Sequence, residues 1–168
     1  MISPNFVLLG VVISFAGSLS YLLDTLKGKA KPNRVTFLLW AVIPLIAFFA
    51  EIKQGVGIQS LTTFMVGFMP ILILVASFAN KKAEWRISSF DIFCGALSIF
   101  GLLLWYITKV GNMAIAFSIF ADGLAALPTI VKSYYYPETE NFYGYLSSAI
   151  ASGITLLTIS VWNLANYG

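Results

Sequence analysis

The sequence has 168 residues, of which 59% are apolar and only 10% are charged, and its formal net charge is +3. Soluble domains contain roughly 45–50% apolar and about 25% charged residues, so the composition excludes a soluble fold, a disordered segment and a nucleic-acid-binding domain. With no histidine and one cysteine, Cys94, a His/Cys metal site, a Ser-His-Asp triad and an internal disulfide are excluded as well. We therefore expect an all-α integral membrane protein that is no enzyme, has no cofactor or metal, and has the lipid bilayer as a partner.

Uncharged stretches separated by short charged segments predict six membrane-spanning helices. A span needs about 20 mostly apolar residues, and an open chain in lipid satisfies its backbone only as a helix. In chain order the predicted helices cover residues 4–25, 34–52, 58–79, 89–108, 112–133 and 142–165. Asp91 is placed to cap the fourth of them. Since no linker interrupts this pattern, residues 1–168 form one predicted transmembrane domain.

The positive charges are distributed unequally between the two sides of these helices. One side carries Lys27, Lys29, Lys31, Arg34, Lys81, Lys82, Arg86 and Lys132, whereas the other carries Lys53 and Lys109. Cytoplasmic loops of membrane proteins are enriched in Lys and Arg. The pattern therefore predicts a protein of the bacterial cytoplasmic membrane, with basic loops in the cytoplasm and both termini outside.

A weak internal repeat relates the first helix pair to the fifth and sixth helices. Residues 14–37 align without a gap on 119–142, and seven of the 24 positions are identical. Because the copies are an even number of helices apart, they would be parallel. The repeat predicts a first three-helix unit at 1–80, a linker helix at 89–108 and a second unit at 112–168 whose last helix is missing. Alternatively, the two hairpins share only residues common to membrane helices.

The second hairpin contains a proline, a lysine and several aromatic residues in a distinctive order. The stretch LPTIVKSYYYPETENFYGYL, followed by VWNLANYG, resembles the SWEET, SemiSWEET and PQ-loop carriers of sugars and amino acids. The resemblance implies that Pro128 and Thr129 form the kink near the cytoplasmic end of a unit's first helix, and that Trp162 marks the outer end of the second. Leu23 stands where the first copy would carry that proline. The stretch GKAKPNRVTFLLW is similar to uncharacterised small bacterial membrane proteins.

Asp122 is the strongest candidate for a functional residue. It is the eleventh residue of the 22-residue span at 112–133, and an Asp at the centre of a membrane helix costs about 2.5–3.5 kcal/mol on insertion scales. Such a residue should face the protein interior, either as a proton or solute site or as an acid bonded to a neighbouring helix. Ser118 and Thr129, at i−4 and i+7, share its predicted face.

Hydroxyl groups at helical spacing predict a polar cavity around Asp122. One stripe includes Ser18 and Tyr21 in the first helix, and another includes Ser148, Ser152 and Trp162 in the sixth. Small polar residues also allow membrane helices to pack closely, which is the alternative interpretation of each stripe. Trp40 lies one or two turns inside the second helix, where it either stacks on a ligand or packs as a core aromatic. Pro128 and Gly123 are potential flexing points.

Two classes of function agree with these features. The first is a SWEET/PQ-loop-like transporter of a small polar solute, proton-linked through Asp122, in which two bundles rock around a central site. The second is a non-transporting membrane sensor, scaffold or assembly partner that forms oligomers, homo-oligomers among them, through the fifth and sixth helices.

Overall fold

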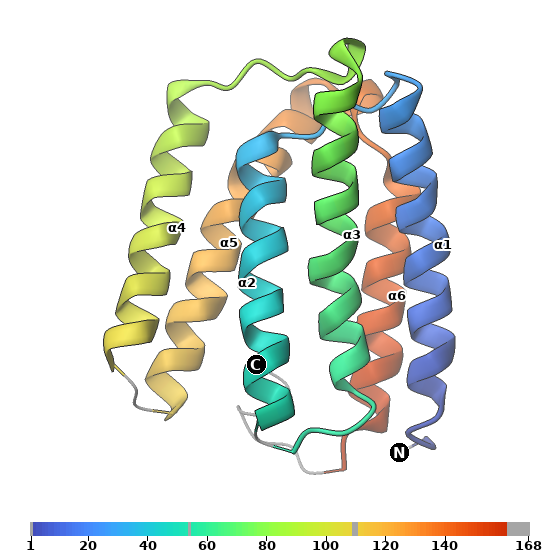
Figure 1. Ribbon diagram of the computed structural model, residues 1–168, viewed down its shortest axis with the longest axis vertical. Helices are drawn as coiled ribbons and strands as arrows, with labels where there is room; N and C mark the ends of the chain where they lie inside the picture. The colour runs from blue at the N-terminus through green and yellow to red at the C-terminus, as the bar shows by residue number, and fades with distance from the viewer. Residues whose placement is uncertain (1, 54, 109–110, 161–168) are drawn as a thin grey trace.

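The protein is an all-helical bundle in the computed structural model, which describes residues 2–53, 55–108 and 111–160 (Figure 1). The helices are α1 (Phe6–Leu26), α2 (Arg34–Lys53), α3 (Ser60–Ala79), α4 (Ser89–Thr108), α5 (Gly111–Tyr135) and α6 (Phe142–Thr158), with short 3₁₀ turns at Lys81–Ala83 and Pro137–Thr139. No strand occurs within the described ranges. The prediction of an all-α fold is confirmed.

Four of the helices have the length and composition of membrane spans. α1 to α4 each contain 20 or 21 residues and are apolar enough to cross a bilayer, for which about 20 residues are needed. α5 is longer but contains Asp122 and Lys132, and α6 has 17 residues. The fold is thus that expected of a helical membrane protein, with large apolar side chains exposed along the bundle.

The helix boundaries agree with the charge pattern except at the end of α6. α4 covers the expected residues, and the other helices begin within two residues of the expected positions. α6 ends at Thr158, seven residues before the expected end at 165. There the Thr158 hydroxyl donates to the carbonyl of Thr155, the acceptor that Ile159 would need to continue the helix. The N–H of Ile159 bonds to Leu156 instead.

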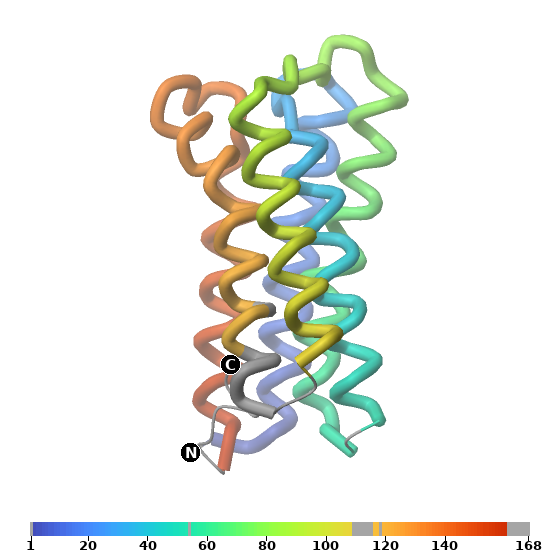
Figure 2. Tube along the Cα trace, turned by 90° about the vertical axis from the view of Figure 1, so that its left-hand side faces the viewer, coloured from blue at the N-terminus to red at the C-terminus, as the bar shows by residue number. Residues whose placement is uncertain are grey.

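The packing order of the helices differs from their order in the chain. α3 lies between α1 and α2 and packs against both, while α1 packs against α6, α2 against α5, and α5 against α4. The connections α1–α2, α3–α4 and α5–α6 lie at one end of the elongated bundle, at the top of Figure 1, and the segment between α2 and α3 lies at the other (Figures 1 and 2). The top end, which carries most of the positive charges, is called the basic end below.

Small residues bring α1 and α6 close together. Gly10 and Gly17 of α1 are buried, and they face Ala151 and Ser147 of α6. Gly144 of α6 approaches α1 in the same way, at the ring of Tyr21. Because lipid supplies no hydrophobic force between helices, such small side chains are the usual means of close packing in a membrane.

Buried asparagines cap two of the helices at the basic end. The side-chain Oδ1 of Asn33 accepts a hydrogen bond from the N–H of Val35 at 3.0 Å, and that of Asn141 accepts from Gly144 at 3.0 Å. Both asparagines are almost fully buried. They satisfy amide groups that the first turns of α2 and α6 would otherwise leave unpaired.

Candidate functional site

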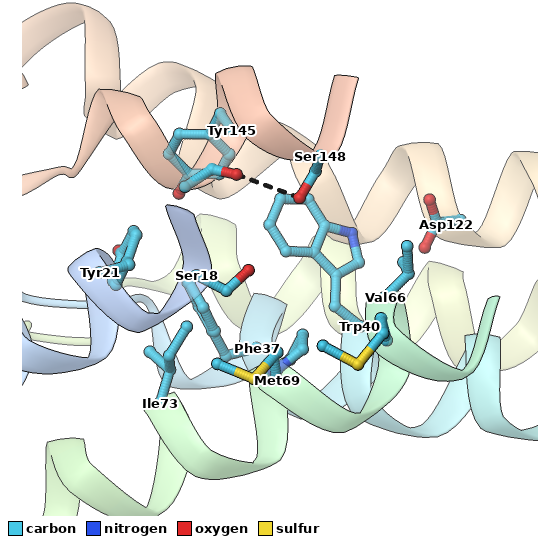
Figure 3. Close-up of a pocket in the computed structure, with 13 residues that line it drawn as sticks. Ser18, Tyr21, Phe37, Trp40, Val66, Met69, Ile73, Asp122, Tyr145 and Ser148 are labelled. Atoms are coloured by element: carbon cyan, nitrogen blue, oxygen red, sulfur yellow. Dashed lines mark hydrogen bonds between the residues drawn. The ribbon is translucent and has the colours of Figure 1, made fainter. Parts of the chain in front are cut away.

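A cavity of about 240 Å³ lies inside the bundle, between α1, α2, α3, α5 and α6 (Figure 3). At about 30 Å³ for each water in the liquid, this is room for roughly eight waters or one small solute. α3 supplies an apolar wall that includes Met65, Met69, Pro70 and Ile73. The polar and aromatic groups come from the other four helices.

The charged group of the cavity is Asp122. Its side chain is half-buried in the middle of α5, and it has no hydrogen-bond or ion-pair partner among the described residues. None of the described residues that line the cavity is basic. The hydroxyls of Ser18 and Ser148 add polar groups, although Ser148 already donates to the carbonyl of Gly144 at 3.0 Å. Among the described residues, an acid without a partner thus faces a space into which no basic side chain extends.

Four aromatic rings form a closed cycle on the cavity wall, here called the aromatic box: Tyr21, Phe37, Trp40 and Tyr145. Successive ring centroids around the cycle are 5.2, 5.8, 6.3 and 5.9 Å apart. These separations lie within the usual range for interacting aromatic side chains. In Figure 3, Trp40 lies between the tyrosine end of the cavity and Asp122.

The two tyrosines of the box close the cavity toward the basic end. The hydroxyls of Tyr21 and Tyr145 both donate to Oε2 of Glu140, at 2.6 and 2.7 Å. The other carboxylate oxygen of Glu140 forms an ion pair with Nζ of Lys132 at 2.5 Å. The side chains of Lys132 and Glu140 are 1% and 6% exposed. These four residues, here called the Glu140 network, join α1, α5, α6 and the α5–α6 connection.

Lys132 is a structural cation and not a free charge of a basic loop. Besides Glu140, its ammonium donates to the carbonyls of Lys31 and Thr139, and it lies 4.8 Å from the centroid of the Trp85 ring. A buried ammonium needs such partners because its desolvation is costly. Lys132 falls within the predicted helix at 112–133, where it was counted among the charges of the basic side, and the structure shows that its side chain is buried within α5.

Five of the residues singled out in the sequence come together at this cavity. They are Ser18 and Tyr21 from α1, Trp40 from α2, Asp122 from α5 and Ser148 from α6. Helical spacing predicts interior faces for Ser18 and Tyr21, for Asp122 and for Ser148, whereas Trp40 was singled out only as an aromatic inside the second helix. The structure brings all of them to one space. The functional role assigned to them stays a prediction.

The other predicted site residues do not line the cavity in the described part of the chain. Thr129 is buried, and its hydroxyl has no partner among the described residues. Ser152 is exposed on α6. The side chain of Ser118 and the whole of Trp162 lie outside the described residues.

The two predicted flexing points both lie within an unbroken helix. α5 is helical through Gly123 and Pro128. Pro128 is buried, whereas Gly123 is exposed with open space where a side chain would be. Neighbouring helices make a proline tolerable inside a membrane helix.

Several residues of the site were not among those predicted from the sequence. Phe37 lies three residues before Trp40, and Tyr145 three residues before Ser148, so helical spacing could have added both to the predicted cavity faces. Glu140 gave no such signal because it lies in a connection, and Tyr21 is 119 residues away from it in the chain.

No family model, curated protein or solved structure matches this chain. The likeness to SWEET and PQ-loop carriers therefore stays a resemblance of short motifs. The function has to be inferred from the geometry of the cavity itself.

Proposed function

We propose that the protein is a membrane carrier of a small polar solute, with the cavity as its binding site and Asp122 as its charged group. The observation that carries this proposal is the unpaired carboxyl of Asp122 on the wall of an interior cavity. An acid at membrane depth costs about 2.5–3.5 kcal/mol. A purely structural acid would recover this cost by bonding to a neighbouring helix, and Asp122 has no such bond among the described residues.

We infer that all six helices span the membrane. At 1.5 Å per residue, the 25 residues of α5 extend about 37 Å, which exceeds the roughly 30 Å of a bilayer core. The 17 described residues of α6 extend about 26 Å and run beside α1 (Figure 1). Asp122 lies near the middle of α5, and Lys132 lies in its last turns at the basic end.

The helix pairing supports two parallel repeats, one containing α1 to α3 and the other α5 and α6, with α4 as the linker. α1 packs against α6 and α2 packs against α5. In terms of the repeats, the first helix of each unit contacts the second helix of the other. A two-fold pseudo-axis along the membrane normal would produce this reciprocal arrangement.

The caps of α2 and α6 provide a register for the repeat. Asn33 and Asn141 cap the second helix of each unit. Four residues after each cap come Phe37 and Tyr145, which both line the cavity. Seven residues after each cap come Trp40 and Ser148, which line it as well. In this register, equivalent residues of the two units are 108 positions apart, which is three more than in the gapless alignment. The additional residues fit an α5 that continues to Tyr135, beyond the predicted end at 133.

In this proposal the observed conformation is closed toward the basic end, which the charge pattern assigns to the cytoplasm. The Glu140 network ties α1, α5 and α6 together beyond the tyrosines of the cavity. Release of the solute to the cytoplasm would require the hydroxyls of Tyr21 and Tyr145 to leave Glu140. Rocking of the two units around the central site would expose it to each side in turn.

Replacing Asp122 by asparagine should reduce solute uptake at least tenfold and remove its dependence on a proton gradient. The measurement is uptake of labelled choline, serine and glucose into proteoliposomes, with and without an imposed pH gradient. Glu51→Gln is the matched control, because Glu51 is a half-buried acid of α2 that bonds to Thr63 outside the cavity. Uptake of none of the three solutes above that of empty liposomes would contradict the carrier. An unchanged rate and pH dependence in Asp122→Asn would reject proton linkage.

A second candidate function is that of a non-transporting module that assembles through α5 and α6. It is favoured by the weak packing of these two helices on each other within the described residues and by their exposed side chains Phe120, Ile130, Ile150 and Leu157. This candidate predicts a stable oligomer in lipid nanodiscs by mass measurement. A monomer that transports solute would argue against it.

A further inference from the structure

We propose that the solute of this cavity is a small organic cation, held between Asp122 and the aromatic box. This inference shares one premise with the proposed function, which is that the cavity binds a solute. The class of solute follows from the charge, the rings and the free hydrogen-bonding groups on the cavity wall, each of which points to the same chemistry.

The charge balance of the cavity favours a positive ligand. Asp122 is the only charged group among the described residues that line it, and it has no protein partner there. The nearby ammonium of Lys132 belongs to the Glu140 network, where the Glu140 carboxylate balances it. A bound cation would give Asp122 the opposite charge that it lacks, in surroundings where water screens little.

The aromatic box provides the second element of cation recognition. Tyr21, Phe37, Trp40 and Tyr145 all line this cavity, and their successive ring centroids are 5.2–6.3 Å apart. The faces of such rings attract ammonium groups within about 6 Å, and tryptophan does so most strongly. Trp40 lies between the tyrosines and Asp122 (Figure 3), so a cation beside the carboxylate would also meet the indole.

The free hydrogen-bonding groups are too few for a polyhydroxylated solute. The hydroxyls of Tyr21 and Tyr145 are already donated to Glu140, and Ser148 donates to the backbone of its own helix. Ser18, Asp122 and the indole N–H of Trp40 remain without a partner among the described residues, opposite the apolar wall of α3. A sugar would leave several buried hydroxyls unpaired, which is costly. Alkyl groups around a cationic nitrogen would instead find methionine and aromatic surfaces.

The test compares choline with 3,3-dimethyl-1-butanol, which has the same shape but a neutral carbon in place of the charged nitrogen. Binding to the full chain in lipid nanodiscs is measured by calorimetry, with n-butylammonium as a second cation and glucose as a neutral polar solute. We expect choline and n-butylammonium to bind at least tenfold more tightly than either neutral compound. Purified protein without a transport gradient is sufficient, so this measurement does not depend on carrier activity.

Two variants test whether Asp122 and Trp40 are the groups that bind the cation. Asp122→Asn should weaken choline binding at least tenfold and leave binding of the neutral alcohol unchanged, whereas Glu51→Gln should alter neither. Trp40→Leu should weaken choline binding about thirtyfold, the size expected for one desolvated cation–π contact. Its matched control is Phe64→Leu, which removes a ring from a separate aromatic cluster with Phe48 and Phe68. Thermal unfolding of each variant establishes that it is folded.

The outcomes separate this inference from the proposed carrier. If folded protein binds neither choline nor n-butylammonium, or binds the neutral alcohol or glucose as tightly as choline, the inference is overturned; uptake of serine or glucose would then still support a carrier. If choline binds with the expected dependence on Asp122 and Trp40 but no solute enters proteoliposomes, the cation site stands and the carrier fails.

Discussion

Replacing Glu140 by glutamine should lower the free energy of unfolding by about 3–5 kcal/mol, the usual cost of breaking a buried ion pair on one side. The substitution keeps the shape of the side chain and removes its charge. The Lys132 ammonium, 1% exposed, would then have only uncharged acceptors, which are the carbonyl oxygens of Lys31 and Thr139 and the amide oxygen of the substituted side chain. The tyrosine hydroxyls would lose a charged acceptor, and hydrogen bonds to charged groups are the stronger class. Equilibrium unfolding in mixed detergent micelles measures the difference.

Two controls isolate the ion pair from general effects of the substitution. Glu138→Gln changes an exposed carboxylate in the same connection and should alter stability by less than about 0.5 kcal/mol. The double variant Lys132→Met, Glu140→Gln should be less destabilised than the sum of the single variants, because no buried charge is left without a counter-ion. Equal stabilities for Glu140→Gln and Glu138→Gln would show that the buried pair contributes little.

The same network explains why stability and access to the cavity should be connected in this protein. Glu140 holds Tyr21 of α1 and Tyr145 of α6 through one carboxylate oxygen and Lys132 of α5 through the other. Any movement that opens the cavity at the basic end must separate these groups. The closed conformation is therefore stabilised by contacts that the transport cycle of the proposed carrier would have to break and remake.

The fold could be predicted from charge and hydropathy because the bilayer imposes a simple rule on this chain. Uncharged runs of about 20 residues become helices, and α4 begins and ends where the pattern places it. Its cap was readable as well: the N–H of Ser88 donates to the Asp91 carboxylate, and the Asp91 N–H donates to the Ser88 hydroxyl. The early end of α6 could not be read, since no proline, glycine or charge follows Thr158 directly to mark it in the sequence.

The candidate site was predictable only as far as local periodicity extends. Asp122, Ser148 and Trp40 were found because a lone acid, a hydroxyl stripe and a deep aromatic are visible along single helices. Whether such faces meet depends on which helices pack against each other. The pattern of residues within one helix does not reveal its neighbours, and so it could not predict that α3 lies between α1 and α2. The burial of Lys132 could not be predicted for the same reason. Its position near a helix end is typical of a loop charge, and its burial depends on partners from three other segments.

Replacing Gly17 by leucine should lower the free energy of unfolding by about 3 kcal/mol, at the upper end of the usual range for overpacking. A Cβ at Gly17 would lie 1.9 Å from Oγ and 2.4 Å from Cβ of Ser147, and 2.6 Å from the backbone oxygen of Tyr143. The serine can rotate only in part, and the backbone oxygen can move only with α6. The substitution must therefore separate α1 from α6, the pair on which one side of the cavity depends.

Gly153→Leu provides the matched control on α6, because a Cβ there meets nothing within 4 Å. It should leave stability unchanged or raise it by up to about 1 kcal/mol, since leucine favours a helix more than glycine does. A Gly17→Ala variant should also lose stability, and adding Ser147→Gly should recover part of that loss, because it removes two of the three close contacts. The rest of the loss should persist because the backbone oxygen of Tyr143 stays in place. Equal unfolding midpoints for Gly17→Leu and Gly153→Leu would mean that α1 and α6 do not approach each other this closely. Because Tyr145 lies on α6, its position beside the cavity would then be in doubt as well.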